Sequence, residues 1–164
     1  MEQEPILKTL QRIPWFLELK PEQMDALSRI ACIRDLVTDE VLFNEGDSED
    51  CLYVLVEGQL RVETHVPGHG MYLLYQAEPL DIVGWSVLTP VVRQRTGTVS
   101  ANNPSCLICF NSQILRQYCE EDNHFGFIIM RRIANVVASR MLITRLRLYK
   151  LLHNDDDPSP IHYV

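Results

Sequence analysis

Gly84 and Arg95 stand eleven residues apart in a segment that could hold an anion. Glycine lets the backbone approach a ligand closely, and the first amides of a short helix over residues 84–88 would point at a negative group. Arg95 would offer a permanently charged, bidentate fork to a phosphate, and the hydroxyl or amide of Thr96 would be a further donor. These residue types predict a small anion-binding site.

The other reactive side chains form no catalytic or metal-binding pattern. His65 and His69 sit in a Pro-Gly turn and lack the His-x-His spacing of a strand-borne metal site. Cys106 and Cys109 have redox spacing in a strand pattern, where positions three apart face opposite sides, so we expect two buried core cysteines. The five cysteines are an odd, scattered set, which indicates reduced thiols. We expect neither an enzyme nor a metal site.

Short apolar or β-branched runs fill the middle of the chain and predict about seven strands. Turn residues separate these runs, and most neighbouring runs have no helix between them. Such spacing favours an antiparallel barrel or jelly roll over a parallel sheet. The runs cover residues 33–37, 40–43, 52–56, 60–65, 71–77, 96–101 and 106–110.

Helical patterns flank the predicted barrel on both sides. Before it, apolar residues at helical spacing precede Pro14, and Pro21 suits the first position of a second helix. After it, Asn111 or Ser112 can cap a helix over residues 112–119. The expected organisation is one domain with N-terminal helices (1–31), a β-barrel (32–111, site segment 82–101), C-terminal helices (112–152) and a flexible tail (153–164).

Three segments, at residues 44–58, 83–88 and 95–101, together with the flanking helices resemble the cyclic nucleotide-binding domain of Crp/Fnr regulators and kinase regulatory subunits. The resemblance covers roughly residues 6–152. It implies a mainly β jelly-roll barrel with flanking helices and a phosphate-binding cassette, in which Gly84 and Leu88 match the family's turn and residues 95–97 match its arginine segment. The ligand-binding residues that it implies are Gly84, Trp85, Ser86, Val87, Arg95, Thr96, Gly97 and Thr144.

Trp85 departs from the family pattern, which has a glutamate there to accept the ribose 2′-hydroxyl. An indole has no acceptor and is much larger than a carboxylate. Losing a charged hydrogen bond costs about 1.5–3 kcal/mol, which lowers affinity by about 10–100-fold. Two alternatives follow: the pocket binds a different anion, with Trp85 stacking on it, or Trp85 plugs a closed pocket.

Residues 123–152 predict a long helix with two apolar stripes. One stripe (Ile129, Ile133, Val136, Ile143) can face the barrel, and the other has heptad spacing suited to a partner helix. We therefore expect a parallel homodimer; the alternative is that one chain buries both stripes. Thr144 also matches the first residue of the family's adenine-contacting Thr-Ser pair, whose second residue is Arg145 here. The predicted dimer interface is Met130, Ala134, Val137, Met141, Thr144, Leu148 and Leu151.

Charge is distributed unevenly along the 164 residues, whose net charge is −7. Residues 1–123 carry −10, residues 124–152 carry +6 and the tail carries −3. The basic side chains of the helix are expected to be solvated or paired with the acidic body. Because the chain is acidic and only about twelve residues follow the long helix, we expect neither direct DNA binding nor a helix-turn-helix. Without a membrane span or secretory segment, we expect a cytoplasmic protein.

The sequence as a whole predicts a regulatory or sensor domain that signals through its dimer helix to an unknown downstream protein. No cofactor is expected, and the possible ligand is a cyclic nucleotide or another small anion. The alternative is a ligand-free dimeric scaffold that keeps the fold and has lost nucleotide binding.

Overall fold

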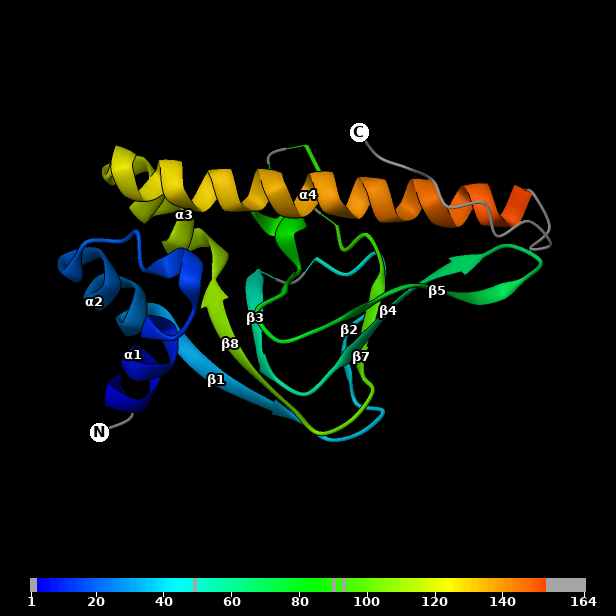
Figure 1. Ribbon diagram of the computed structural model, residues 1–164, viewed down its shortest axis with the longest axis horizontal. Coiled ribbons are helices and arrows are strands. Elements are labelled where there is room, and N and C mark those ends of the chain that lie inside the picture. Colours follow the sequence, from blue (N-terminus) through cyan, green and yellow to red (C-terminus); the bar gives the residue numbers. More distant parts are fainter. Residues whose placement is uncertain (1–2, 49, 90, 93, 153–164) are drawn as a thin grey trace.

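The computed structural model describes residues 3–48, 50–89, 91–92 and 94–152, so the predicted tail lies outside it. In these residues eight strands form two four-stranded sheets whose paired strands are all antiparallel (Figure 1). The sheet orders are β1-β8-β3-β6 and β2-β7-β4-β5. The strands are β1 (Ala31–Leu36), β2 (Val41–Phe43), β3 (Cys51–Glu57), β4 (Leu60–Val66), β5 (Gly70–Ala77), β6 (Ile82–Val83), β7 (Thr98–Ala101) and β8 (Ser105–Asn111).

The jelly-roll prediction is confirmed, and each of the seven predicted runs contains a strand. The strand that the sequence pattern misses is β6, because two residues are too few to show an alternation. It pairs with β3 and leads directly into the predicted site segment.

Helices flank the barrel as predicted. They are α1 (Gln3–Gln11), α2 (Pro21–Ile30), α3 (Ser112–Glu121) and α4 (Asn123–Leu152), with single 3-10 turns η1 (Pro14–Phe16) and η2 (Trp85–Leu88). Pro21 begins α2, and the Asn111 side chain caps α3 by accepting from the amides of Gln113 and Ile114. None of the described helices has the length and apolar content needed to cross a bilayer.

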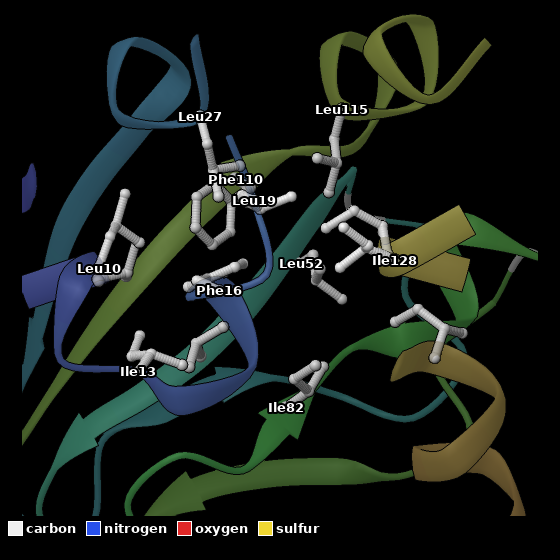
Figure 2. Packing of buried hydrophobic residues seen from close by; sticks show 14 of the residues in the cluster. Leu10, Ile13, Phe16, Leu19, Leu27, Leu52, Ile82, Phe110, Leu115 and Ile128 are labelled. Atoms are coloured by element: carbon white, nitrogen blue, oxygen red, sulfur yellow. The ribbon is translucent and has the colours of Figure 1, made fainter. Parts of the chain in front are cut away.

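The hydrophobic core has two parts, one on each face of β8. Alternation along that strand sends Ile108 and Phe110 toward the helices and Leu107 and Cys109 toward the opposite sheet. Figure 2 shows the helical part, where Phe16 of η1 lies edge-on to Phe110 with ring centroids 6.1 Å apart. This part holds α1, α2 and α3 against the first sheet.

The long helix α4 lies across the barrel and continues above the β4–β5 hairpin (Figure 1). Its predicted barrel-facing stripe is buried at Ile129, Ile133 and Val136, and Ile143 is half-buried. Gly126 allows α4 to approach α3 closely, since a Cβ there would overlap the Cys119 carbonyl oxygen. The first half of α4 is therefore fixed to the core, and its second half lies over the site.

Candidate functional site

Two neighbouring segments build the site. Gly84 lies between β6 and η2 as the N-cap of η2, in the left-handed conformation (φ 77°), while residues 95–97 lead into β7. The structure brings together six of the eight predicted site residues around one small cavity of ≈ 20 Å³. That volume has room for about one water molecule, far less than a nucleotide needs. The six are Gly84, Trp85, Ser86, Arg95, Thr96 and Gly97.

The Arg95 side chain points into the barrel and is only 2% exposed. Its Nη1 donates to the Gly84 carbonyl oxygen at 3.0 Å, and its Nη2 donates to the Cys51 carbonyl oxygen at 2.8 Å. The guanidinium carbon also lies 4.2 Å from the centre of the Phe43 ring, within cation–π range. The fork predicted for a phosphate thus binds the protein's own backbone.

Backbone hydrogen bonds fix the place from which Arg95 projects. Its amide donates to the Asp47 carbonyl oxygen at 2.9 Å, and its carbonyl oxygen accepts from the Gly46 amide at 3.0 Å. The Asn44–Asp47 turn therefore holds residue 95 beside the start of β3. From this position a long side chain reaches both Cys51 and Gly84.

The remaining residues of the 84–88 turn have different roles. Trp85 is half-buried and lines the small cavity, whereas Val87 is buried in the core and does not line it. The Val87 carbonyl oxygen accepts from Nη2 of Arg116 on α3 at 2.9 Å. The turn is thus hydrogen-bonded both to α3, through Arg116, and to Arg95.

A much larger cavity of ≈ 630 Å³ lies between α4 and the β4–β5 hairpin, and we call it the α4 groove. Thr144, the eighth predicted residue, lies there and not in the small cavity. Trp85, Thr96, Tyr75 and Val62 line both cavities and separate them. Along α4 the groove is lined by Val137, Arg140, Met141, Thr144, Arg145 and Leu148.

Arg140 ties α4 to the barrel at the floor of this groove. Its guanidinium carbon lies 3.8 Å from the centre of the Tyr75 ring, and its Nη2 lies 3.3 Å from an Asp81 carboxylate oxygen. Burial raises the pKa of Tyr75 to about 12, although Arg140 acts in the opposite direction. The expected pairing of basic helix residues with the acidic body is confirmed here and at Arg131, which pairs with Glu18. The stacking of Arg140 on Tyr75 could not be predicted, since it depends on how α4 meets the hairpin.

The predicted dimer stripe lies on the surface of the single chain. Met130, Met141, Leu148 and Leu151 are 43%, 70%, 55% and 53% exposed, respectively. The smaller members follow the same pattern, with Ala134 and Thr144 exposed and Val137 half-buried. Large apolar side chains at this exposure, in a heptad row, form an unpartnered face.

The described residues include no metal-binding cluster, and the two cysteines of β8 differ in burial. Among the described residues, no group of three or more His, Cys, Asp or Glu side chains is arranged to hold a metal ion. Cys109 is buried as predicted, but Cys106 is only half-buried, so that prediction was wrong. Cys106 is paired with the exposed Asp35 of the edge strand β1, which leaves it partly open. Burial, with Asp35 beside it, raises the pKa of Cys106 to about 11.

Solved structures with the same fold come from several bacteria. A candidate cyclic nucleotide-binding protein of Geobacter metallireducens is 23% identical, with a TM-score of 0.71 over 86% of this chain and 98% of its own. The N-terminal domain of a Streptomyces coelicolor transcriptional regulator is 24% identical, with a TM-score of 0.63 over 92% and 99%. The c-di-GMP responsive global regulator CLP of Xanthomonas campestris is 17% identical, with a TM-score of 0.72 over 83% and 66%. At these identities the likeness shows the fold.

Sequence comparison adds the family. No curated protein matches the chain in sequence. The family model described as the cyclic nucleotide-binding domain matches residues 33–122, more than half of the chain. The match spans both segments of the site. The chain therefore belongs to the cyclic nucleotide-binding domain family, whose fold supports a regulatory or sensor domain.

Proposed function

We propose that this chain is a non-enzymatic regulatory domain that acts as a homodimer through α4 and does not hold cyclic AMP or cyclic GMP in its cassette. The observation that carries the proposal is the position of Arg95, buried and bonded to two backbone carbonyls beside a cavity of ≈ 20 Å³. A cyclic phosphate would have to displace both hydrogen bonds and open the cavity. The free energy needed for this rearrangement lowers the affinity of every nucleotide that binds through Arg95.

The α4 groove supports a role for a ligand of another shape. Its volume of ≈ 630 Å³ lies within the range of about 300–1,000 Å³ typical of small-molecule sites. Val137, Met141, Thr144 and Leu148 belong both to its lining and to the predicted dimer stripe. A partner helix on the stripe would therefore cover the groove, and a small anionic ligand beside Arg140 and Arg145 would contact the dimer interface directly.

The closed cassette also favours a second candidate function, a ligand-free dimeric scaffold that signals by protein contact alone. Trp85 stands where the resemblance expects the ribose-binding glutamate, and it packs against the helical core. The two candidates share the dimer and differ in whether the α4 groove is occupied. They are separated by the ligand dependence of the melting temperature.

Cyclic AMP and cyclic GMP are expected to leave the melting temperature and the tryptophan fluorescence of the purified protein unchanged. A ligand present at about 100 times its Kd stabilises a fold by about 2.7 kcal/mol. For a domain of this size that raises the Tm by roughly 5–10 °C, which is easily measured. A saturable rise in melting temperature with either nucleotide would contradict the closed cassette.

Cyclic dinucleotides are tested in the same titration. A rise in melting temperature with one of them would favour the sensor over the ligand-free scaffold.

The variant Trp85→Glu restores the carboxylate that the family pattern has at this position. A response to cyclic AMP that appears only in this variant would identify Trp85 as the plug. If cyclic AMP changes neither the melting temperature nor the fluorescence of the variant, the hydrogen bonds of Arg95 to its two carbonyl partners keep the site closed. Because the chain contains two tryptophans, Trp85→Phe is needed to assign any fluorescence change to Trp85.

Met141→Glu is expected to convert the dimer into monomers. Met141 is 70% exposed in the single chain and central in the stripe, so a twofold interface would bury two carboxylates in an apolar row. A penalty of several kcal/mol weakens association by about 100-fold or more. Sedimentation should give twice the 19.0 kDa chain mass for the wild type and the chain mass for the variant.

Ser139→Glu is the matched control for this dimer test. Ser139 is exposed and lies about 160° around the helix from Met141, at about 100° per residue. The same charge placed there should leave the mass unchanged. A wild type that sediments as a monomer, or an unaltered mass in Met141→Glu, would rule out the stripe as the interface.

A further inference from the structure

Three thiols gather at one end of the first sheet, and the site described above uses only the backbone carbonyl of one of these residues, Cys51. Cys32 lies on β1, Cys109 on β8 and Cys51 on β3, and all three are free cysteines. The thiols of Cys51 and Cys32 are neighbours of the Cys109 thiol. The residues are far apart in sequence, so the strand register alone brings them together.

The register makes Cys32 and Cys109 direct cross-strand partners. Directly opposed residues of an antiparallel pair have Cα atoms about 4.5 Å or about 5.5 Å apart. A disulfide requires a Cα separation of about 4.4–6.8 Å, so the two backbones already lie at bonding distance. Cys51 is paired with Asn111, while the β3 residue opposite Cys109 is Tyr53. Cys51 is thus a diagonal neighbour, with a longer backbone separation than Cys32.

The Cys32 and Cys109 thiols differ in their exposure to solvent. Cys32 is exposed on the edge strand, where a dissolved oxidant can reach it, whereas Cys109 is 7% exposed. Burial, together with the neighbouring thiols of Cys51 and Cys32, raises the pKa of Cys109 well above its ordinary value. The thiolate is the form that attacks a peroxide, so oxidation begins at the exposed partner.

We propose that Cys32 and Cys109 form a modification site at which hydrogen peroxide closes a cross-strand disulfide. In the first step the Cys32 thiolate attacks the peroxide, the O–O bond breaks, and sulfenic acid and hydroxide form. In the second step the Cys109 sulfur attacks the Cys32 sulfenic sulfur, and the new S–S bond releases water after proton transfer. Overall, one peroxide oxidises two thiols and is reduced to two molecules of water. The site does not depend on ligand binding or on the dimer.

Closure of this bond would link β1, the strand that carries the chain from α2 into the barrel, to the central strand β8. Since Cys32 is exposed, its sulfur in such a disulfide is also open to attack by external thiols. We therefore expect dithiothreitol to reverse the modification. This separates it from the higher oxidation states of cysteine, which dithiothreitol does not reduce.

Peptide mapping of the full-length protein after treatment with hydrogen peroxide tests the assignment. Trypsin places Cys32 in peptide 30–34, Cys51 in peptide 35–61, and both Cys106 and Cys109 in peptide 96–116. The expected product, seen without reductant and lost with it, is peptide 30–34 joined to peptide 96–116. Fragmentation should place the bond at Cys109.

Variants make the outcome decisive. Cys32→Ser changes an exposed residue and should abolish the cross-link without affecting the fold. Cys106→Ser, on the same strand and in the same peptide as Cys109, is the matched control and should leave the cross-link intact. A link from peptide 35–61 to peptide 96–116, a link that survives Cys32→Ser, or oxidation of Cys32 without any cross-link would overturn the proposal.

Discussion

Replacing Arg95 with alanine is expected to destabilise the protein by about 3–5 kcal/mol, because hydrogen bonds from a charged group contribute about 1.5–3 kcal/mol each. The side chain donates two such bonds, to the carbonyl oxygens of Cys51 and Gly84, and stacks on Phe43. Truncation leaves both carbonyls without these bonds and opens a void in the barrel. For a domain of this size the melting temperature should fall by about 10 °C or more.

Thermal and urea unfolding of Arg95→Ala, with nucleotide absent, measure this effect. Gln94→Ala changes the exposed neighbouring residue and is the matched control, expected to shift the free energy of unfolding by less than about 0.5 kcal/mol. Arg95→Lys keeps the charge but cannot span both carbonyls, so it should recover only part of the loss. An Arg95→Ala protein as stable as the wild type would show that the guanidinium hydrogen bonds do not stabilise the fold. It would favour a role for Arg95 in ligand binding.

Gly84→Ala is expected to destabilise the protein by roughly 3 kcal/mol, through backbone strain of about 1–2 kcal/mol and a steric conflict of similar size. Gly84 has a φ of 77°, which L residues with a side chain rarely adopt. A Cβ there would overlap Nη1 of Arg95 and lie 3.1 Å from the Cys51 carbonyl oxygen. The arginine cannot yield freely, because both of its terminal nitrogens are hydrogen-bonded.

Gly68→Ala separates the two contributions. Gly68 has a similar φ of 81°, but a Cβ there would meet nothing within 4 Å, so this variant carries the backbone strain alone. The double variant Gly84→Ala/Arg95→Ala should lose less stability than the sum of the single variants, by about 1 kcal/mol or more, because the conflict is absent once the guanidinium is removed. Strict additivity would contradict a direct contact between the two residues.

The fold was largely predictable because its signals are local. Strand runs with turn residues between them, the proline that begins α2 and the asparagine that caps α3 each depend on a few neighbouring residues. The heptad stripe and the barrel-facing stripe of α4 likewise follow from helical periodicity, and the structure places them on an exposed and a buried face. Only β6 is too short to leave such a signal.

The site was less predictable because its geometry is not local. Sequence spacing brought Gly84 and Arg95 together, but the direction of the guanidinium depends on the Cys51 carbonyl, 44 residues away from it. Every residue has a backbone carbonyl, so the residue types do not indicate which carbonyl accepts a hydrogen bond from Arg95. The same limit applies to Cys32 and Cys109. Both are free thiols, as their scattered positions predict, but only the strand register places them opposite each other.

The attachment of α4 has a mechanical consequence. The barrel-facing side of the helix is buried at Ile133 and Val136, and two later arginines hold it to β5. Arg140 stacks on Tyr75, and Nε of Arg147 donates to the Leu74 carbonyl oxygen at 3.3 Å, while residues 148–152 are exposed. The two attachments are about 10 Å apart along the helix and reach consecutive residues of β5. A displacement of β5 beside the groove would therefore move this part of α4 as a unit and carry the exposed end of the helix with it.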